Sequence, residues 1–256
     1  MRYQVLGPLR VTSEDTVLRI GAPKMESVLT ALLARANQVV SKAALLTEIW
    51  GEDPPRRAVP AVHVYISQLR KLLATPERTE SPIVTRPPGY VLLAGPEDLD
   101  CTVFQRLVQQ GRTQMERGRT EEAARSFEQA LGLWRGPARN ELRGGPIVDG
   151  YMTWLEECRL ECVQDHIEVS LLLGRHRSVV SWLSGLVTEY PLHEAFYGQL
   201  MRALHASDRR ADALQVYRRA WDVLDREFGL EPSPTLRNLQ QSLLAADLRR
   251  PMRPAI

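Results

Sequence analysis

Polar and basic side chains recur on one face of a predicted helix that ends near Leu73. Helical spacing gives this helix one apolar stripe, made of Val62, Ile66, Leu69 and Leu73. At 100° per residue, the opposite face carries His63, Val64, Ser67 and Lys71, with Gln68 and Arg70 at its margins. Glutamine can pair with adenine, and a valine methyl group can contact thymine. The pattern fits two interpretations equally: a helix that contacts base edges in the major groove, and an ordinary solvated polar face.

Basic residues stand at both ends of this helix and on the segment that follows it. Arg56 and Arg57 precede the helix, Arg70 and Lys71 lie in its last turn, and Arg86 lies on a predicted hairpin. Such side chains neutralise phosphates and fix a protein on a duplex without reading sequence. Arg86 can reach a phosphate or an adjacent minor groove. For Arg70, an ion pair within its own domain is an equal alternative.

The surrounding pattern predicts the elements that hold these residues in place. Period-two runs predict short strands at residues 3–6, 9–11 and 16–20, with a turn at 13–15. Helical spacing begins at Glu26 and is closed by Asn37, and a brief extended piece follows at residues 39–40. Ser41 is suited to cap a second helix that runs through Trp50. Pro60 fits the first turn of the third helix, and residues 83–86 and 90–93 predict a hairpin.

A boundary at residues 95–98 divides the chain into two domains and a tail. We expect a winged helix-turn-helix over residues 1–95, an all-α helical-repeat domain over residues 99–246, and a flexible basic tail over residues 247–256. The fold class is therefore mainly α with a small β component. Residues 1–96 carry a net charge of +4 and residues 97–245 one of −4, which suits one domain that meets nucleic acid and one that does not.

The second domain shows degenerate repeats. Its helices break at Gly118-Arg119, Gly174-Arg175 and Asp208-Arg209, and similar residues follow the first and last of these breaks. Arg175 and Arg209 are separated by 34 residues, which is the tetratricopeptide (TPR) period. A TPR-like arrangement of helix hairpins is predicted. Its four tryptophans are expected to be core rather than contact residues, namely Trp134, Trp154, Trp182 and Trp221.

Both domains resemble known families. Trp50-Gly51, residues 66–73 and residues 85–90 look like an OmpR-type winged helix, although Pro87-Pro88 departs from the usual wing sequence. Residues 127–138, and residues 213–219 together with 227–234, look like a bacterial transcriptional activation domain. This order of domains is similar to the Streptomyces antibiotic regulatory protein (SARP) family of the AfsR/DnrI type. The resemblance covers roughly residues 1–245 and adds Thr85 to the predicted DNA contacts.

The resemblance implies a transcriptional activator of a secondary-metabolite (antibiotic) gene cluster, in the cytoplasm at the nucleoid. Such a protein binds direct repeats near the promoter −35 region as a homodimer and recruits RNA polymerase holoenzyme, including its sigma factor. Direct repeats require a head-to-tail arrangement and a spacing of about one helical turn, roughly 10 bp. Two alternatives stay open: a repressor, and a TPR-like interaction scaffold that keeps an unused winged helix.

Enzymatic chemistry is not indicated by the sequence. It contains no phosphate-binding P-loop motif, no dinucleotide-binding glycine motif after a strand and no HExxH zinc motif. Asp165, His166 and Glu168 are neighbours on a helix, but no nucleophile motif accompanies them. We therefore expect a protein that is not an enzyme, has no cofactor and holds no metal.

The cysteines and the apolar segments indicate the cellular compartment. Three cysteines, Cys101, Cys158 and Cys162, form an odd set without a CxxC motif, so buried thiols are favoured over a disulfide or a zinc site. The first residues lack the layout of a signal peptide, and no window is long and apolar enough to span a bilayer. The cytoplasm is the expected compartment, with no membrane partner.

Overall fold

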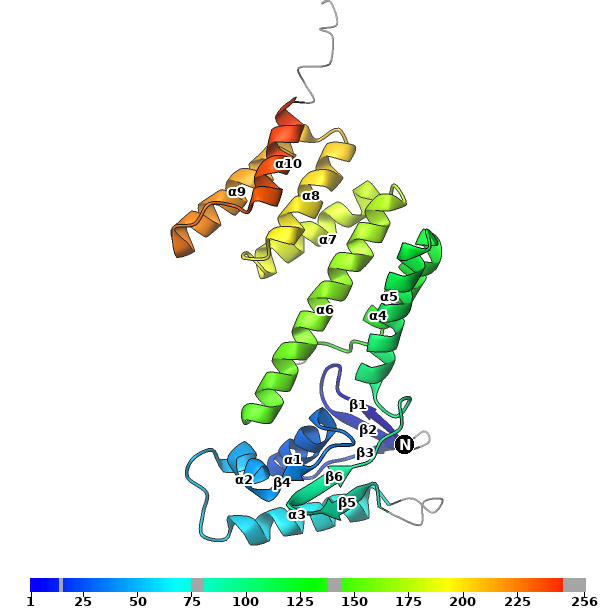
Figure 1. The fold of residues 1–256 in the computed structure, drawn as a ribbon, viewed down its shortest axis with the longest axis vertical. Coiled ribbons are helices and arrows are strands. Elements are labelled where there is room, and N and C mark those ends of the chain that lie inside the picture. The colour runs from blue at the N-terminus through cyan, green and yellow to red at the C-terminus, as the bar shows by residue number, and fades with distance from the viewer. Residues whose placement is uncertain (14–15, 75–80, 138–143, 246–256) are drawn as a thin grey trace, which may run out of the picture. The chain divides into compact units, whose positions relative to one another are not determined.

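The computed structural model describes residues 1–13, 16–74, 81–137 and 144–245 (Figure 1). The fold is mainly α with two small sheets, as predicted. The chain forms two compact units, one of residues 1–110 and 126–162 and the other of residues 111–125 and 163–256. The predicted tail over residues 247–256 and most of the predicted turn at 13–15 lie outside the described residues.

The first sheet opens the chain. Strands β1 (Arg2–Gln4), β2 (Arg10–Ser13) and β3 (Thr16–Leu18) are antiparallel in that order, and buried Tyr3 pairs with buried Val11. Each strand matches one of the three predicted, but β1 stops at Gln4 rather than at residue 6. The reason is that the backbone N–H groups of Val5 and Leu6 donate to the Asp100 carboxylate, at 2.8 and 3.1 Å.

Three helices form the body of the winged helix. Helices α1 (Pro23–Ala34), α2 (Lys42–Trp50) and α3 (Ala58–Leu72) pack against one another. Helix α1 begins three residues before the predicted Glu26, because Pro23 is pre-shaped for the first helical position. The predicted cap of α2 is confirmed, since the Ser41 hydroxyl accepts the Ala44 N–H at 3.0 Å.

A second sheet carries the wing. Strand β6 (Gly89–Leu92) lies between β4 (Val40–Ser41) and β5 (Ile83–Arg86), and both pairings are antiparallel. Gly89 is required at the start of β6, because a Cβ there would lie 1.8 Å from the Val40 carbonyl oxygen. The hairpin predicted over residues 83–93 is therefore confirmed and is closed by a third, short strand.

The rest of the described chain is helical. Its helices are α4 (Asp100–Glu116), α5 (Thr120–Leu131), α6 (Pro146–Leu172), α7 (His176–Glu189), α8 (Glu194–Ala206), α9 (Arg210–Phe228) and α10 (Pro234–Ala245). Helix α8 packs against α7, α9 and α10, which makes the last four helices one stack of hairpins (Figure 1). No helix among the described residues is long and apolar enough to cross a membrane.

The predicted repeats correspond to a turn of the same geometry that follows three of the helices. Gly118, Gly174 and Asp208 all have a left-handed backbone, with φ of 70°, 73° and 60°. The arginine after each one donates its backbone N–H to the carbonyl five residues earlier, at 2.9 Å in every case. These hydrogen bonds close the ends of α4, α6 and α8 in the same way, so the self-similarity read from the sequence reflects a shared turn geometry.

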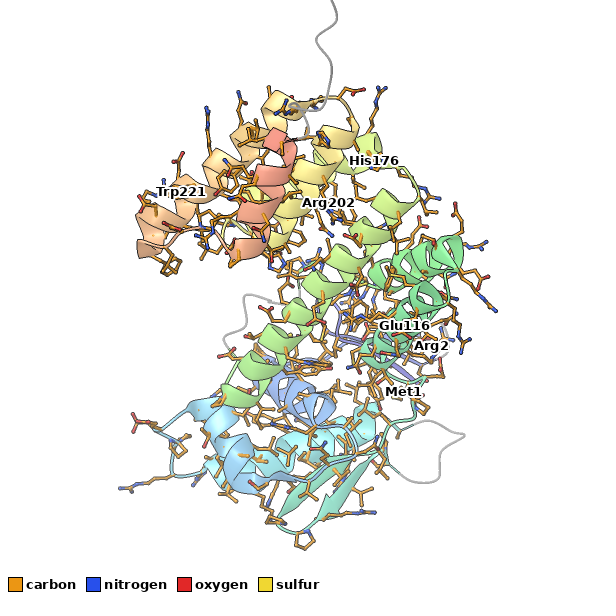
Figure 2. The ribbon with its side chains drawn as sticks, turned by 45° about the horizontal axis from the view of Figure 1, so that its top comes forward. Met1, Arg2, Glu116, His176, Arg202 and Trp221 are labelled. Carbon is orange, nitrogen blue, oxygen red and sulfur yellow. The ribbon has the colours of Figure 1, made fainter. Side chains whose placement is uncertain are left out.

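The prediction that the four tryptophans of the second domain are core residues fails for three of them. Trp134 packs edge-on against buried Phe104, with ring centroids 5.6 Å apart. Trp154, Trp182 and Trp221 are 40%, 38% and 38% exposed, so the prediction that they are core residues is wrong. Each of these three lies beside one ring, Tyr151, His166 or Tyr217, and leaves part of its indole in solvent. Figure 2 marks Trp221 on α9.

The cysteines are thiols, as expected. Cys101 and Cys162 are buried, and Cys158 is half-buried. Cys158 and Cys162 both lie on α6, four residues apart. Among the residues that the structure describes, no group of three His, Cys, Asp or Glu side chains is placed to hold a metal ion.

Candidate nucleic-acid interface

Helix α3 divides into two faces, as its sequence predicts. Val62, Ile66 and Leu69 are at most 2% exposed and face the rest of the winged helix. The opposite side is exposed to solvent and comprises His63, Val64, Ser67, Gln68 and Lys71. Val64 is 51% exposed, so its methyl groups are accessible to a partner. These five residues therefore form a continuous surface at groove-reading spacing.

The basic residues around α3 are available to an anionic partner. Arg56 and Arg57 lie in the loop before α3, Lys71 lies in its last turn, and Arg86 ends β5. All four are exposed, and within the described residues none forms an ion pair. Arginines of the second unit are often paired, for example Arg175 with Glu121 at 2.9 Å. Unpaired cations can exchange counterions for phosphates without first breaking an internal bond.

Arg70 and Thr85 are placed differently from the other predicted contacts. The Arg70 Nε–H donates to the Ile83 carbonyl at 2.9 Å, and its Nη2–H donates to the Thr85 hydroxyl at 2.8 Å. Arg70 is half-buried, and its guanidinium carbon lies 6.0 Å from the Tyr90 ring centroid. The arginine therefore joins α3 to the wing, through hydrogen bonds rather than the ion pair considered from the sequence.

The wing itself is held by buried residues. Arg86 pairs with Gly89 across the hairpin, and Pro87 and Pro88 form the exposed tip between them. Tyr90 is buried, and burial raises the pKa of its hydroxyl while the nearby Arg70 charge opposes that rise. The hairpin thus presents Arg86 from a packed base, as an anchored contact requires.

A second support, not singled out from the sequence, lies on the other side of α3. Trp50 stacks on Tyr65 of α3 with ring centroids 6.5 Å apart, and the Lys24 ammonium lies 4.9 Å from the Trp50 ring centroid. The cluster ties the end of α2 to both α1 and α3. The Trp50-Gly51 pair was noted for its resemblance, but its physical role is this contact.

A buried carboxylate was also missed. Glu48 is 4% exposed, although no role was predicted for it from the sequence. Its oxygens accept the backbone N–H groups of Gly145 and Ile147 at 2.7 Å and of Val148 at 3.2 Å, all at the start of α6. The available signal was its position three residues after buried Leu45, on the apolar face of α2.

A three-helix body, a hairpin wing and an exposed polar helix with unpaired cations define a winged-helix transcription regulator. Residues 20–92 match the family described as "Transcriptional regulatory protein, C terminal", and residues 99–244 match the "Bacterial transcriptional activator domain". The chain belongs to the Streptomyces antibiotic regulatory protein family, whose members are transcriptional activators.

The relatives include proteins of different length. The chain is 36% identical to the regulatory protein AfsR of Streptomyces griseus over 98% of its own length, but it spans 25% of AfsR. It is 35% identical to the regulatory protein DnrI of Streptomyces peucetius, covering 96% of this chain and 93% of DnrI. The solved structure of Mycobacterium tuberculosis EmbR, in complex with a low-affinity phosphopeptide, superposes with a TM-score of 0.90 at 34% identity. That match covers 98% of this chain and 66% of the EmbR chain.

Proposed function

We propose that this protein binds direct repeats near the promoter −35 region of a secondary-metabolite gene cluster and recruits RNA polymerase holoenzyme there. Two copies bind head to tail, one on each repeat, with their α3 helices in successive major grooves about 10 bp apart. The observation that carries the DNA-binding part is the exposed face of α3, flanked by Arg56, Arg57, Lys71 and Arg86.

The roles on DNA follow from side-chain chemistry. Gln68 and Val64 contact base edges, while His63 and Ser67 fill the centre of the groove. Arg56, Arg57, Lys71 and Arg86 contact phosphates. Arg70 and Thr85 act mainly by fixing the wing, because their polar atoms bind each other and β5.

A gel-shift titration tests DNA binding. The probes are the promoter regions beside the gene, a version with one repeat scrambled, and a random duplex of equal length. We expect two shifted species on the intact promoter, one on the scrambled probe, and survival of both in excess random competitor. Disappearance of the shifted species when random competitor is added, or a single shifted species on the intact promoter, contradicts paired sequence-specific binding.

The polymerase contact is assigned to helix α9 in the second unit. Trp221, Asp225 and Phe228 recur at helical spacing along α9, and all three are exposed. Phe228 is 60% exposed and Leu230, just beyond the helix, is 58% exposed. Asp222 and Asp225 form no ion pair among the described residues. An apolar strip with unpaired carboxylates fits a basic, partly apolar protein surface, as on a sigma factor.

A gel shift of the complex of promoter, protein and RNA polymerase holoenzyme distinguishes the polymerase contact from DNA binding. Trp221→Ala and Phe228→Ala are expected to bind the promoter as the wild type does but to lose the supershift given by RNA polymerase holoenzyme. Leu192→Ala is the matched control, since Leu192 is an apolar residue 48% exposed in the same unit. Supershifts equal in all three variants contradict this surface. Run-off transcription from the same promoter separates activation from repression.

A further inference from the structure

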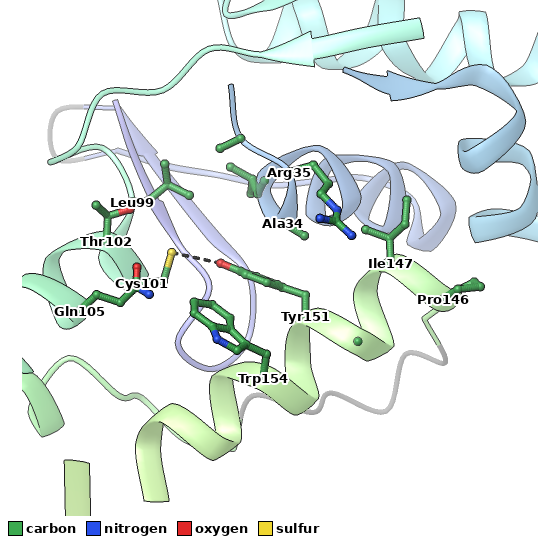
Figure 3. A pocket seen from close by; sticks show the side chains of 13 residues that line it. Ala34, Arg35, Leu99, Cys101, Thr102, Gln105, Pro146, Ile147, Tyr151 and Trp154 are labelled. Carbon is green, nitrogen blue, oxygen red and sulfur yellow. Dashed lines mark hydrogen bonds between the residues drawn. The ribbon is translucent and has the colours of Figure 1, made fainter. Parts of the chain in front are cut away.

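A cavity of about 430 Å³ lies within the first unit (Figure 3). It lies between the end of α1, the start of α4 and the first turns of α6. Its volume falls in the range of pockets that hold small organic molecules. The exposed face of α3 contributes no residue to it, so it is distinct from the candidate DNA interface.

One wall of the cavity is aromatic. The rings of Tyr151 and Trp154 are stacked, with centroids 5.6 Å apart and planes 24° apart. The Tyr151 hydroxyl donates to the Cys101 sulfur at 3.0 Å, which fixes the tyrosine ring against the start of α4 (Figure 3). Trp154 is 40% exposed. A preformed pair of rings, one of them partly exposed, suits a flat aromatic molecule that packs against them.

The charge in the cavity favours an anion. Arg35, just after α1, is exposed and forms no ion pair among the described residues, and Figure 3 shows its side chain reaching toward α6. Thr102 and Gln105 add polar groups from α4. No Asp or Glu is among the described residues that line the cavity. A guanidinium that forms no ion pair is matched to a carboxylate, which it binds through two parallel hydrogen bonds.

Gly150 keeps the cavity open. It lies inside α6, where glycine is disfavoured relative to other residues, and it lines the cavity. A Cβ at this position would meet no atom within 4 Å. A larger side chain there has room to enter the space without displacing the fold.

We propose that this cavity is a binding site for a flat aromatic carboxylate. The ring lies against Trp154 and Tyr151, and the carboxylate binds the Arg35 guanidinium. The site does not depend on DNA binding, and its occupancy is measured on the full chain without DNA.

Isothermal titration calorimetry with 1-naphthoate tests the cavity. We expect saturable 1:1 binding to the wild type and a loss of at least about tenfold in affinity for Gly150→Leu, whose side chain occupies the space. Gly185→Leu is the control, since Gly185 also lies inside a helix, has no atom within 4 Å of an added Cβ and does not line the cavity. The absence of saturable binding, or equal affinity in both leucine variants, overturns the site.

The charge is tested by a second variant and a neutral ligand. Arg35→Gln replaces an exposed lining residue with an uncharged one and leaves the aromatic wall of Tyr151 and Trp154 unchanged. It is expected to weaken 1-naphthoate about fivefold and to leave 1-naphthamide unchanged. An equal loss for both ligands, or no loss for the carboxylate, overturns the assignment of Arg35 and with it the anionic class of ligand.

Discussion

The Glu48 carboxylate accepts the backbone N–H of Gly145 at 2.7 Å, across 97 positions of sequence. Its second oxygen accepts the N–H of Ile147 at the same distance. Glu48 belongs to α2 of the helix-turn-helix, and Gly145 immediately precedes α6. A carboxylate at this position interacts favourably with the positive end of the α6 dipole. It also accepts hydrogen bonds from N–H groups that have no partner within the first turn of a helix. A side chain of the winged helix therefore acts as the cap of a helix in the activator region.

Removing this cap should lower stability. Glu48→Ala leaves the amides of Gly145, Ile147 and Val148 without their acceptor, and we expect a loss of about 2 kcal/mol in the free energy of unfolding. Urea denaturation followed by circular dichroism measures it. Glu52→Ala is the matched control, because Glu52 is an exposed acid in the loop after α2. Equal stability of the two variants would show that the cap contributes nothing.

Gly145 should not tolerate a side chain. An added Cβ would lie 2.5 Å from both the Cα and the carbonyl oxygen of Glu48, so Gly145→Ala must separate α2 from the start of α6. We expect a loss of about 1–3 kcal/mol in urea denaturation. Gly185→Ala, in open space inside α7, should instead gain up to about 1 kcal/mol. A gain at both positions would contradict the close approach.

Lys71 and Gln68 should affect DNA binding in different ways. Lys71→Ala is expected to weaken binding to specific and random duplexes alike and to reduce the slope of log affinity against log salt by about one. Gln68→Ala should instead cost about 1–3 kcal/mol on the cognate repeats and little on random DNA. Fluorescence anisotropy at several salt concentrations measures both, with Arg117→Ala, an exposed cation of the second unit, as the control. Identical behaviour of the first two variants would refute the assigned roles.

The Arg70–Thr85 hydrogen bond should act through the wing rather than through charge. Thr85→Val removes the hydroxyl that accepts from Arg70 Nη2–H but keeps every cation. We expect about 1 kcal/mol lower stability and weaker DNA binding with an unchanged salt slope. Thr12→Val, at a half-buried strand position in the other sheet, is the control for the substitution itself. A salt slope lowered by about one in Thr85→Val would instead mean that the wing carries a phosphate contact with it.

Local pattern was sufficient to predict much of the DNA-binding half. The apolar stripe of α3 and the Ser41 cap depend on residues within one or two turns, so periodicity and capping rules locate them. Arg70 was ambiguous because its partners, Ile83 and Thr85, lie more than a dozen positions away in a different element. A local charge pattern locates an arginine on a helix but does not identify the group to which it donates a hydrogen bond.

Long-range contacts explain what the sequence did not reveal. Within its own helix, Glu48 has no feature that distinguishes it from other acidic residues. Its hydrogen-bond acceptor role depends on the start of α6, almost a hundred residues later in the chain. The tryptophans were expected in the core because large apolar side chains usually are, yet Trp154, Trp182 and Trp221 each lie beside one ring and leave part of the indole in solvent. The cavity beside Tyr151 and Trp154 is likewise assembled from three separate segments.

The Glu168–Arg202 pair predicts an acid-sensitive component of stability in the second unit. Arg202 of α8 donates to Glu168 of α6, through Nη1 at 2.9 Å and also through Nη2, and Gln199 adds a weaker bond. Hydrogen bonds from Arg202 lower the pKa of Glu168 below its ordinary value of 4.5, although partial burial opposes them. A carboxyl whose pKa is lower in the folded state stabilises the protein above its ordinary pKa. That stabilisation is lost as the pH falls through 4.5 toward the lowered pKa.

We therefore expect Arg202→Gln to lower the Tm at about pH 7 and to flatten the fall in Tm between about pH 5 and pH 3. Both side chains are partly exposed, so the effect is modest. Arg226→Gln is the control, because Arg226 pairs with Glu227 on the exposed end of α9. Differential scanning fluorimetry across this pH range measures all three proteins. Parallel curves for the wild type and Arg202→Gln would mean that the pair makes no net contribution to folding.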